Sequence, residues 1–228
     1  MKFKSQVYTE ASGSIGGVTY SRNRGGAYTR SRTVPVNPNS PEQQAVRGLV
    51  ATLTSTWGNV LTAGQRDAWD FYAESVPLPD ALGEPRNPGG LGMYVRCNVP
   101  RLQTTLARID DAPGVFDLGV FTNPSVDSVD AAADTIDVAF TNTDPWATAV
   151  GGGMLVYASR PKNPTINYFK GPYRFAGLVA GAAVAPTSPA TVDLPFPVVV
   201  GQRIFVQLRF SQVDGRLSLP FRLFGTAA

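Results

Sequence analysis

Hydrophobic residues recur at different periods along this chain, and the change between the periods divides it. Between residues 40 and 112 they recur every three or four positions, the spacing of one face of an α-helix. From residue 113 to the end they alternate with polar residues, as in half-buried β-strands. Residues 1–39 are glycine-rich and contain two short alternating stretches. We therefore expect an arm (1–39), a helical domain (40–112) and a β-domain (113–228) in an α+β fold.

The helical part begins with a strong start signal, since Ser40 suits a helix N-cap and Pro41 its first turn. A second start follows at Thr62, with Gln65 placed to complete a capping box. The short link between the two predicts an αα-hairpin, and a third, weaker helix follows over residues 91–106, interrupted by Pro100. The expected buried stripes are Val46, Leu49, Val50, Leu53 and Trp57 in the first helix and Ala68, Trp69, Tyr72, Ala73 and Val76 in the second. We expect Trp57 to pack against Trp69 and Tyr72, which makes these aromatic residues core rather than a ligand site.

The C-terminal part contains about seven short alternating segments separated by turn residues such as Asp214-Gly215. Clear examples are residues 136–140 and 204–210, where every second side chain is large and apolar. Many short strands with regular turns predict an antiparallel β-sandwich of the immunoglobulin type.

The arm contains two alternating stretches, residues 18–22 and 27–32, joined by a stretch that can turn. This pattern predicts a β-hairpin from which tyrosine and arginine side chains project. A two-stranded hairpin alone is marginal in water, so either the rest of the chain or a partner must support it. The candidate assembly residues are Tyr20, Arg22, Arg24, Tyr28, Arg30 and Arg32.

Charge is segregated along the chain although the net charge is only +3. Residues 1–34 carry six basic residues and one acid, residues 109–159 carry eight Asp and no base, and residues 160–228 carry eight bases and two acids. In a homo-oligomer an acidic patch on one copy can face a basic patch on the next. The alternative is that the blocks neutralise each other within one sandwich.

The composition excludes most catalytic chemistry. The chain has no His and a single Cys, Cys97, so it cannot form a Ser-His-Asp triad, a Cys-His pair, a His-ligated metal site or an internal disulfide. Asp110 and Asp111 are adjacent and should point apart, and the four acids Asp127, Asp130, Asp134 and Asp137 lack EF-hand spacing. We expect no enzymatic activity, no catalytic residues, no cofactor and no metal, with Cys97 buried as a small apolar residue.

No targeting signal is visible, because the residues after Lys2 and Lys4 are polar where a signal peptide would be apolar. The longest apolar run, residues 176–186, is too short to span a membrane. We therefore expect a protein without a membrane partner that is made in a reducing cytoplasm.

Two resemblances add to this picture. Residues 202–218, which contain Ile204-Phe205-Val206-Gln207-Leu208 and then Gly215-Arg216-Leu217-Ser218, resemble the last two strands of fibronectin type III domains. Residues 25–69, with Gly25-Gly26-Ala27-Tyr28-Thr29-Arg30, Gln43-Gln44-Ala45-Val46-Arg47 and Gln65-Arg66-Asp67-Ala68-Trp69, resemble uncharacterised structural proteins of tailed phages and prophages. The second resemblance implies a virion-associated protein and brings no catalytic residues.

Two functions are therefore in contention. The first is a non-enzymatic structural component of a phage virion (capsid decoration, neck or tail), assembled in the host cytoplasm through contacts with copies of itself and other virion proteins. The second is a nucleic-acid-binding protein that uses the basic arm, in which arginine would contact phosphates and tyrosine would stack on bases.

Overall fold

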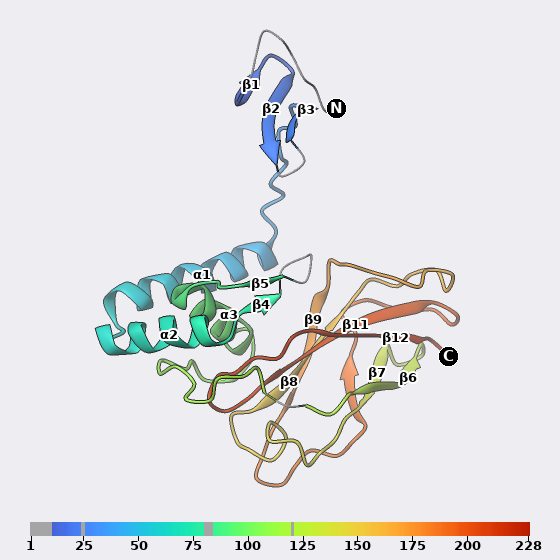
Figure 1. Ribbon diagram of the computed structural model, residues 1–228. Helices are drawn as coiled ribbons and strands as arrows, with labels where there is room; N and C mark the ends of the chain where they lie inside the picture. Colours follow the sequence, from blue (N-terminus) through green and yellow to red (C-terminus); the bar gives the residue numbers. More distant parts are fainter. Residues whose placement is uncertain (1–10, 24–25, 80–83, 120) are drawn as a thin grey trace. The chain divides into compact units, whose positions relative to one another are not determined.

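The computed structural model describes residues 11–23, 26–79, 84–119 and 121–228, which form an α+β fold (Figure 1). The chain divides into two compact units, residues 1–43 and residues 44–228. The change from helices to strands near residue 112 therefore falls inside one compact unit.

The first unit contains a three-stranded antiparallel sheet with the order β1-β2-β3. Its strands are β1 (Gly13–Ile15), β2 (Val18–Asn23) and β3 (Gly26–Ser31). The strands β2 and β3 pair as the alternating pattern predicted, with Val18 opposite Ser31 and Tyr20 opposite Thr29. The short strand β1 was not predicted, and it pairs with β2 so that Ile15 lies opposite Val18.

Three helices lie in the predicted helical part, and their bounds are α1 (Pro41–Asn59), α2 (Ala63–Ser75) and α3 (Gly90–Leu102). The predicted capping box at the start of α2 is confirmed, because the Thr62 hydroxyl accepts from the Gln65 backbone N–H at 3.2 Å and the Gln65 side chain accepts from the Thr62 N–H at 2.9 Å. The α3 helix stops two residues after Pro100, earlier than predicted. Across the described ranges, the structure has no helix whose length and apolarity would let it cross a membrane. A short ribbon, β4 (Leu78–Pro79) with β5 (Pro85–Arg86), lies between α2 and α3 in the sequence.

Helical periodicity predicted the buried face of α2 better than that of α1. In α2, Trp69, Tyr72 and Ala73 are buried. In α1 only Leu53 of the predicted stripe is fully buried, whereas Val46 and Val50 are 37% and 38% exposed. Spacing shows which residues share a helix face, but it does not show whether another element covers that face.

The aromatic core of the helices includes a ring that the sequence prediction left out. Tyr94 of α3 contacts both tryptophans, with ring centroids 5.7 Å from Trp57 and 5.5 Å from Trp69. Trp69 also meets Tyr72 edge-to-face at 5.9 Å, as expected for neighbours on α2. The third helix therefore completes the core that the hairpin of α1 and α2 was expected to form.

Seven strands of the C-terminal part form two antiparallel sheets, one with the order β10-β7-β6 and the other with the order β12-β11-β8-β9. Their bounds are β6 (Ser125–Asp130), β7 (Thr135–Ala139), β8 (Gly153–Ala158), β9 (Arg174–Ala180), β10 (Ala190–Asp193), β11 (Arg203–Ser211) and β12 (Phe221–Thr226). Both sheets contribute to a common core that includes Ile136, Trp146, Val206 and Phe210. This arrangement is consistent with the predicted immunoglobulin-like sandwich.

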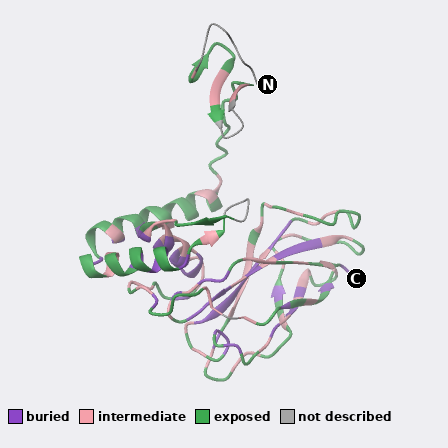
Figure 2. Cartoon of the chain, viewed as in Figure 1, coloured by how far each residue is buried: buried purple, intermediate pink, exposed green. Residues whose placement is uncertain are grey.

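The strand β8 is apolar at consecutive positions because both of its faces are covered. Met154 and Val156 pack in the sandwich core, whereas Leu155 and Tyr157 pack with the helices around Trp69 and Tyr94. The helices therefore cover part of the outer face of the four-stranded sheet, and the buried residues extend through both layers (Figure 2).

Candidate assembly interface

The arm sheet holds the residues that sequence reasoning selected. Tyr20 and Arg22 lie on β2, Tyr28 and Arg30 lie on β3, and Arg32 follows β3 directly. Arg24 lies outside the described residues. The backbone N–H of Arg32 donates to the Gly17 carbonyl at 2.8 Å, which holds the end of β3 against the β1–β2 turn.

The strand register divides these side chains between the two faces of the sheet. Residues directly opposite each other in an antiparallel pair share a face, and successive residues alternate between faces. Tyr20 lies opposite Thr29, and Tyr28 lies opposite Ser21. Tyr20 and Arg22 therefore share one face, and Tyr28 and Arg30 share the other.

The face that carries Tyr20 also carries exposed aliphatic residues. Ile15 lies opposite Val18, and Gly13 lies opposite Tyr20, so β1 adds to this face. Ile15 is 79% exposed and Val18 is 37% exposed. We call Ile15, Val18, Tyr20 and Arg22 the Tyr20 face. Sequence reasoning missed Ile15 because it predicted no strand before residue 18.

The opposite face is more polar. The hydroxyls of Ser14 and Thr19 form a 2.8 Å hydrogen bond across β1 and β2, and Arg30 lies opposite Thr19. We call Thr19, Tyr28 and Arg30 the Tyr28 face. The described candidates on β2 and β3 therefore lie on both faces of the sheet, and the two faces differ in chemistry.

Every charged residue that the structure describes between positions 11 and 39 is an arginine. The side chains of this segment are half-buried or exposed wherever the structure describes them, and none is buried. Residues 32–39 have no regular structure, and Val34 and Val36 are 77% and 89% exposed. The segment therefore has the character of a surface rather than of a folded core.

The single cysteine is buried in the second unit. Cys97 is 0% exposed in α3, and burial raises the pKa of its thiol to about 11. A thiol with a raised pKa is almost entirely protonated at neutral pH and is a poor nucleophile. The expectation that Cys97 is a buried apolar residue is confirmed.

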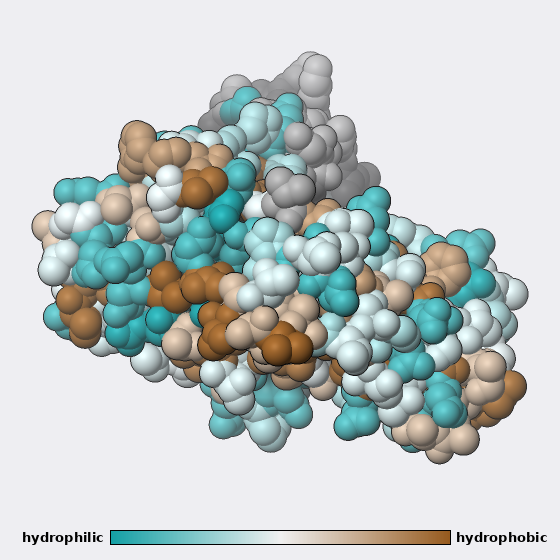
Figure 3. All heavy atoms as spheres, turned by 90° about the horizontal axis from the view of Figure 1, so that it is seen from below, coloured by the Kyte–Doolittle hydropathy of each residue, from teal (hydrophilic) through white to brown (hydrophobic). Residues whose placement is uncertain are grey.

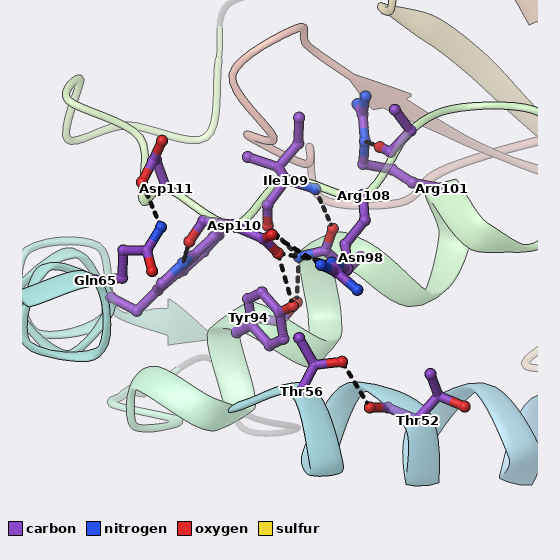
Figure 4. Close-up of polar contacts among 12 residues, drawn as sticks. Thr52, Thr56, Gln65, Tyr94, Asn98, Arg101, Arg108, Ile109, Asp110 and Asp111 are labelled. Carbon is purple, nitrogen blue, oxygen red and sulfur yellow. Dashed lines mark hydrogen bonds and ion pairs between the residues drawn. The ribbon is translucent and has the colours of Figure 1, made fainter. Parts of the chain in front are cut away.

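Asp110 and Asp111 serve different partners, as their adjacency predicted (Figure 4). Asp110 accepts from Arg108 Nε at 2.6 Å and from the Tyr94 hydroxyl at 3.2 Å, whereas Asp111 accepts from Gln65 Nε2 at 2.8 Å. The Arg108 guanidinium holds the pKa of the Asp110 carboxyl below its ordinary value, the Tyr94 hydroxyl adds to this, and partial burial opposes it. These contacts fasten the 108–111 loop to α2 and α3 and do not form an acid–base pair.

Three acids of the 125–137 hairpin also accept structural hydrogen bonds. Asp130 accepts from the Ala132 N–H at 2.7 Å, Asp134 accepts from the Val198 N–H at 2.7 Å, and Asp137 accepts from the hydroxyls of Ser128 and Thr191. Within the described ranges no three His, Cys, Asp or Glu side chains gather as metal ligands would.

The second unit also exposes hydrophobic side chains. Phe71 of α2 and Phe116 meet edge-to-face at 5.1 Å while remaining 56% and 49% exposed. Figure 3 shows hydrophobic side chains gathered in patches between hydrophilic ones on one side of the molecule. Such patches are common on protein surfaces and do not by themselves identify a partner.

The comparisons with known proteins add little to this description. No family model matches the sequence. No curated protein matches it either. Among solved structures, the crystal structure of a Fn3-like protein from Clostridium thermocellum is similar over 49% of this chain and 95% of that chain, with 18% identity and a TM-score of 0.30.

Proposed function

We propose that this chain is a non-enzymatic structural protein of a tailed-phage virion, and that its N-terminal arm joins it to neighbouring subunits. The observation that carries the proposal is the arm sheet, which has no buried side chain among its described residues and yet displays Ile15, Val18 and two tyrosines.

A three-stranded sheet of this size needs another surface packed against it to be stable. Isolated small sheets are marginal in water, and a hydrophobic face gains stability only when another surface removes it from water. The Tyr20 face offers aliphatic, aromatic and guanidinium groups together, and aromatic residues and arginine are enriched at protein interfaces. A neighbouring subunit is the cover that fits this chemistry best.

The edges of the arm sheet offer a second means of contact. The order β1-β2-β3 leaves one side of β3 without a strand partner in the described sheet. An unpaired edge can add a strand from another chain through backbone hydrogen bonds. The arm can therefore bind through a face, an edge or both.

The virion assignment depends on the resemblance of residues 25–69 to structural proteins of tailed phages and prophages. The partners that follow from it are further copies of this chain and other virion proteins. The sandwich fits this role, because sandwiches of this type serve many proteins as interaction modules and need no catalytic residues.

The alternative, a nucleic-acid-binding arm, is favoured by one observation: the described charges between residues 11 and 39 are all arginines. Arginine suits phosphate contacts, and the tyrosines could stack on bases. The division of the arginines between two faces weakens this alternative, because a groove that follows a nucleic-acid backbone gathers its cations on one side.

The test compares the full-length chain with a variant that lacks residues 1–34. Particles released on lysis are purified and examined by mass spectrometry and electron microscopy for this protein, and the two forms are compared for incorporation. We expect the truncated form to keep the circular dichroism of a folded helix-and-strand protein and to be lost from the particles.

Two outcomes contradict the proposal. Normal incorporation of the truncated form would show that the arm is not an assembly element. Binding of the full-length chain to DNA, with an affinity that falls steeply between 50 and 200 mM salt and is lost on truncation, would favour the nucleic-acid alternative.

A further inference from the structure

Arg209 lies on the face of β11 that the helices partly cover. Its opposite residue on β8 is Leu155, which packs in the core formed with the helices. Arg209 is half-buried, and its Nε is buried with no hydrogen-bond acceptor. Within the described ranges the structure gives its guanidinium neither a hydrogen bond nor an ion pair.

A second arginine reaches the same place from α3. Arg96 Nη2 donates to the Ser218 carbonyl at 2.9 Å, and its Nη1 is buried without an acceptor. Ser218 is itself tied to Phe210, the residue after Arg209, because Phe210 N–H donates to Ser218 Oγ and Ser218 N–H donates to the Phe210 carbonyl, both at 2.9 Å. These contacts bring the guanidinium of Arg96 beside the end of β11 that carries Arg209.

The two guanidinium groups repel each other, and among the described residues neither forms an ion pair. Burial lowers the pKa of Arg209, and the nearby charge of Arg96 lowers it further, while Tyr157 opposes this. Arginine nevertheless stays protonated in proteins, so two positive charges interact unfavourably here. Like charges that are partly removed from water are destabilising unless an anion compensates them.

A neighbouring arginine shows what a satisfied buried guanidinium looks like in this protein. Arg101 is 1% exposed, and its Nε, Nη1 and Nη2 all donate. Its acceptors are the carbonyls of Ala107, Gln212 and Gly151 and the hydroxyl of Ser211, at 2.7 to 3.1 Å. Packing in this region can therefore satisfy a buried arginine fully. Arg203 Nε is also buried without an acceptor, but Arg203 Nη1 donates to Ile166 and Asn167, whereas Arg209 donates to no described residue.

We propose that Arg96 and Arg209 form a binding site for an oxyanion, a phosphate or carboxylate group, at the seam between α3 and the four-stranded sheet. Arg96 Nη1 and Arg209 Nε are the donors that the structure leaves unused, and an anionic oxygen accepts from such groups in short, charge-assisted hydrogen bonds. Both residues are half-buried, whereas the two unused donor atoms are themselves buried, so binding an anion requires the groups that cover them to move. This site lies within residues 44–228 and does not depend on the role of the arm.

The first test measures thermal unfolding of the full-length chain in sodium phosphate, sodium acetate and sodium chloride at matched ionic strength. We expect phosphate or acetate to raise the melting temperature in a saturable way, by about 4 °C once the anion exceeds its dissociation constant roughly tenfold. The anion that gives the larger rise in melting temperature is the preferred ligand group.

Two variants locate the effect. Arg209→Met should abolish the rise and should be no less stable than the wild type in chloride, because it replaces an unpaired charge with an apolar side chain. Arg86→Met removes the same charge from an exposed position on β5 and should keep the full rise. Arginine Nε–H signals in NMR spectra should shift on phosphate addition for Arg209 and Arg96 in the wild type.

The proposal is overturned if neither anion raises the melting temperature above that in chloride. It is also overturned if Arg209→Met retains the rise, because the anion then binds elsewhere. A marked loss of stability of the Arg209→Met variant in sodium chloride would show that Arg209 stabilises the fold without a bound anion. This result would also contradict the proposal.

Discussion

The strands β2 and β8 are both six residues long and both pair on two sides, yet their surroundings differ completely. In β8 five of the six residues are buried, because one face enters the sandwich core and the other meets the helices. In β2 no described side chain is buried. Backbone pairing is thus common to both, and only β8 gains the free energy of apolar burial on two sides. The difference is the reason that we place β8 in the scaffold and propose β2 as part of a surface that binds a partner.

The largest expected effect tests the covered side of this comparison. Trp69 is 0% exposed and its Nε1 donates to the Asp110 carbonyl at 2.9 Å. Trp69→Ala should lower the free energy of unfolding by about 3–5 kcal/mol through the cavity and the lost burial. Phe71→Ala on the same helix is the matched control, because Phe71 is 56% exposed and should cost less than about 1 kcal/mol. Urea unfolding measures both, and similar losses would contradict the assigned core.

A second prediction concerns the polar contacts that join the helices to the sandwich. Arg101→Met removes the Nη1 donor to Ser211 Oγ and the Nη2 donor to the Gly151 carbonyl, and leaves these acceptors without that partner. We expect a loss of about 2–4 kcal/mol in guanidinium unfolding. A loss below 1 kcal/mol would mean that apolar packing alone holds the helices on the sheet.

A third prediction follows from the lowered pKa of Asp110. Because the folded protein binds this proton less readily than the unfolded chain, the contribution is present above the unfolded pKa and is lost as pH falls through the folded pKa. Stability should therefore decline on acidification below about pH 4. Arg108 and Asp110 are each 34% exposed, so solvent screening should keep the effect below about 1 kcal/mol. Melting temperatures between pH 5 and pH 2.5 should fall less in Asp110→Asn than in the wild type, with Asp67→Asn as the control.

The smallest effect on stability is expected in the arm. Val18→Asp places a charge on the Tyr20 face, where Val18 is 37% exposed, and should change the unfolding of the main transition by less than about 0.5 kcal/mol. The same change should abolish assembly, whereas Thr19→Asp on the Tyr28 face should weaken it less. Unfolding by urea and incorporation into particles are the two measurements. A stability loss as large as that of Trp69→Ala would contradict the contrast between β2 and β8.

The division of the arm residues was itself accessible from the sequence. A turn that pairs Arg22 with Ala27 pairs even-numbered residues of one strand with odd-numbered residues of the other. Tyr20 and Tyr28, both even, must then lie on opposite faces. The candidate interface predicted from the sequence therefore includes residues on both faces of the sheet.

Local features of this protein were determined by the sequence itself. The capping box of Thr62 and Gln65 and the alternation of β11 depend on residue types at short spacing, so neighbouring positions predict them. The absence of His excluded whole classes of chemistry without any structure.

Only the tertiary structure decided which faces are covered and which charges are paired. Val46 and Leu53 belong to the same apolar stripe of α1, yet one is exposed and the other buried. Arg101 finds its acceptor Ser211 at a separation of 110 residues, whereas Arg209 finds none within the described ranges. Periodicity acts over a few residues, but burial and hydrogen-bond partners depend on which distant segments pack together, and that is a property of the whole folded chain.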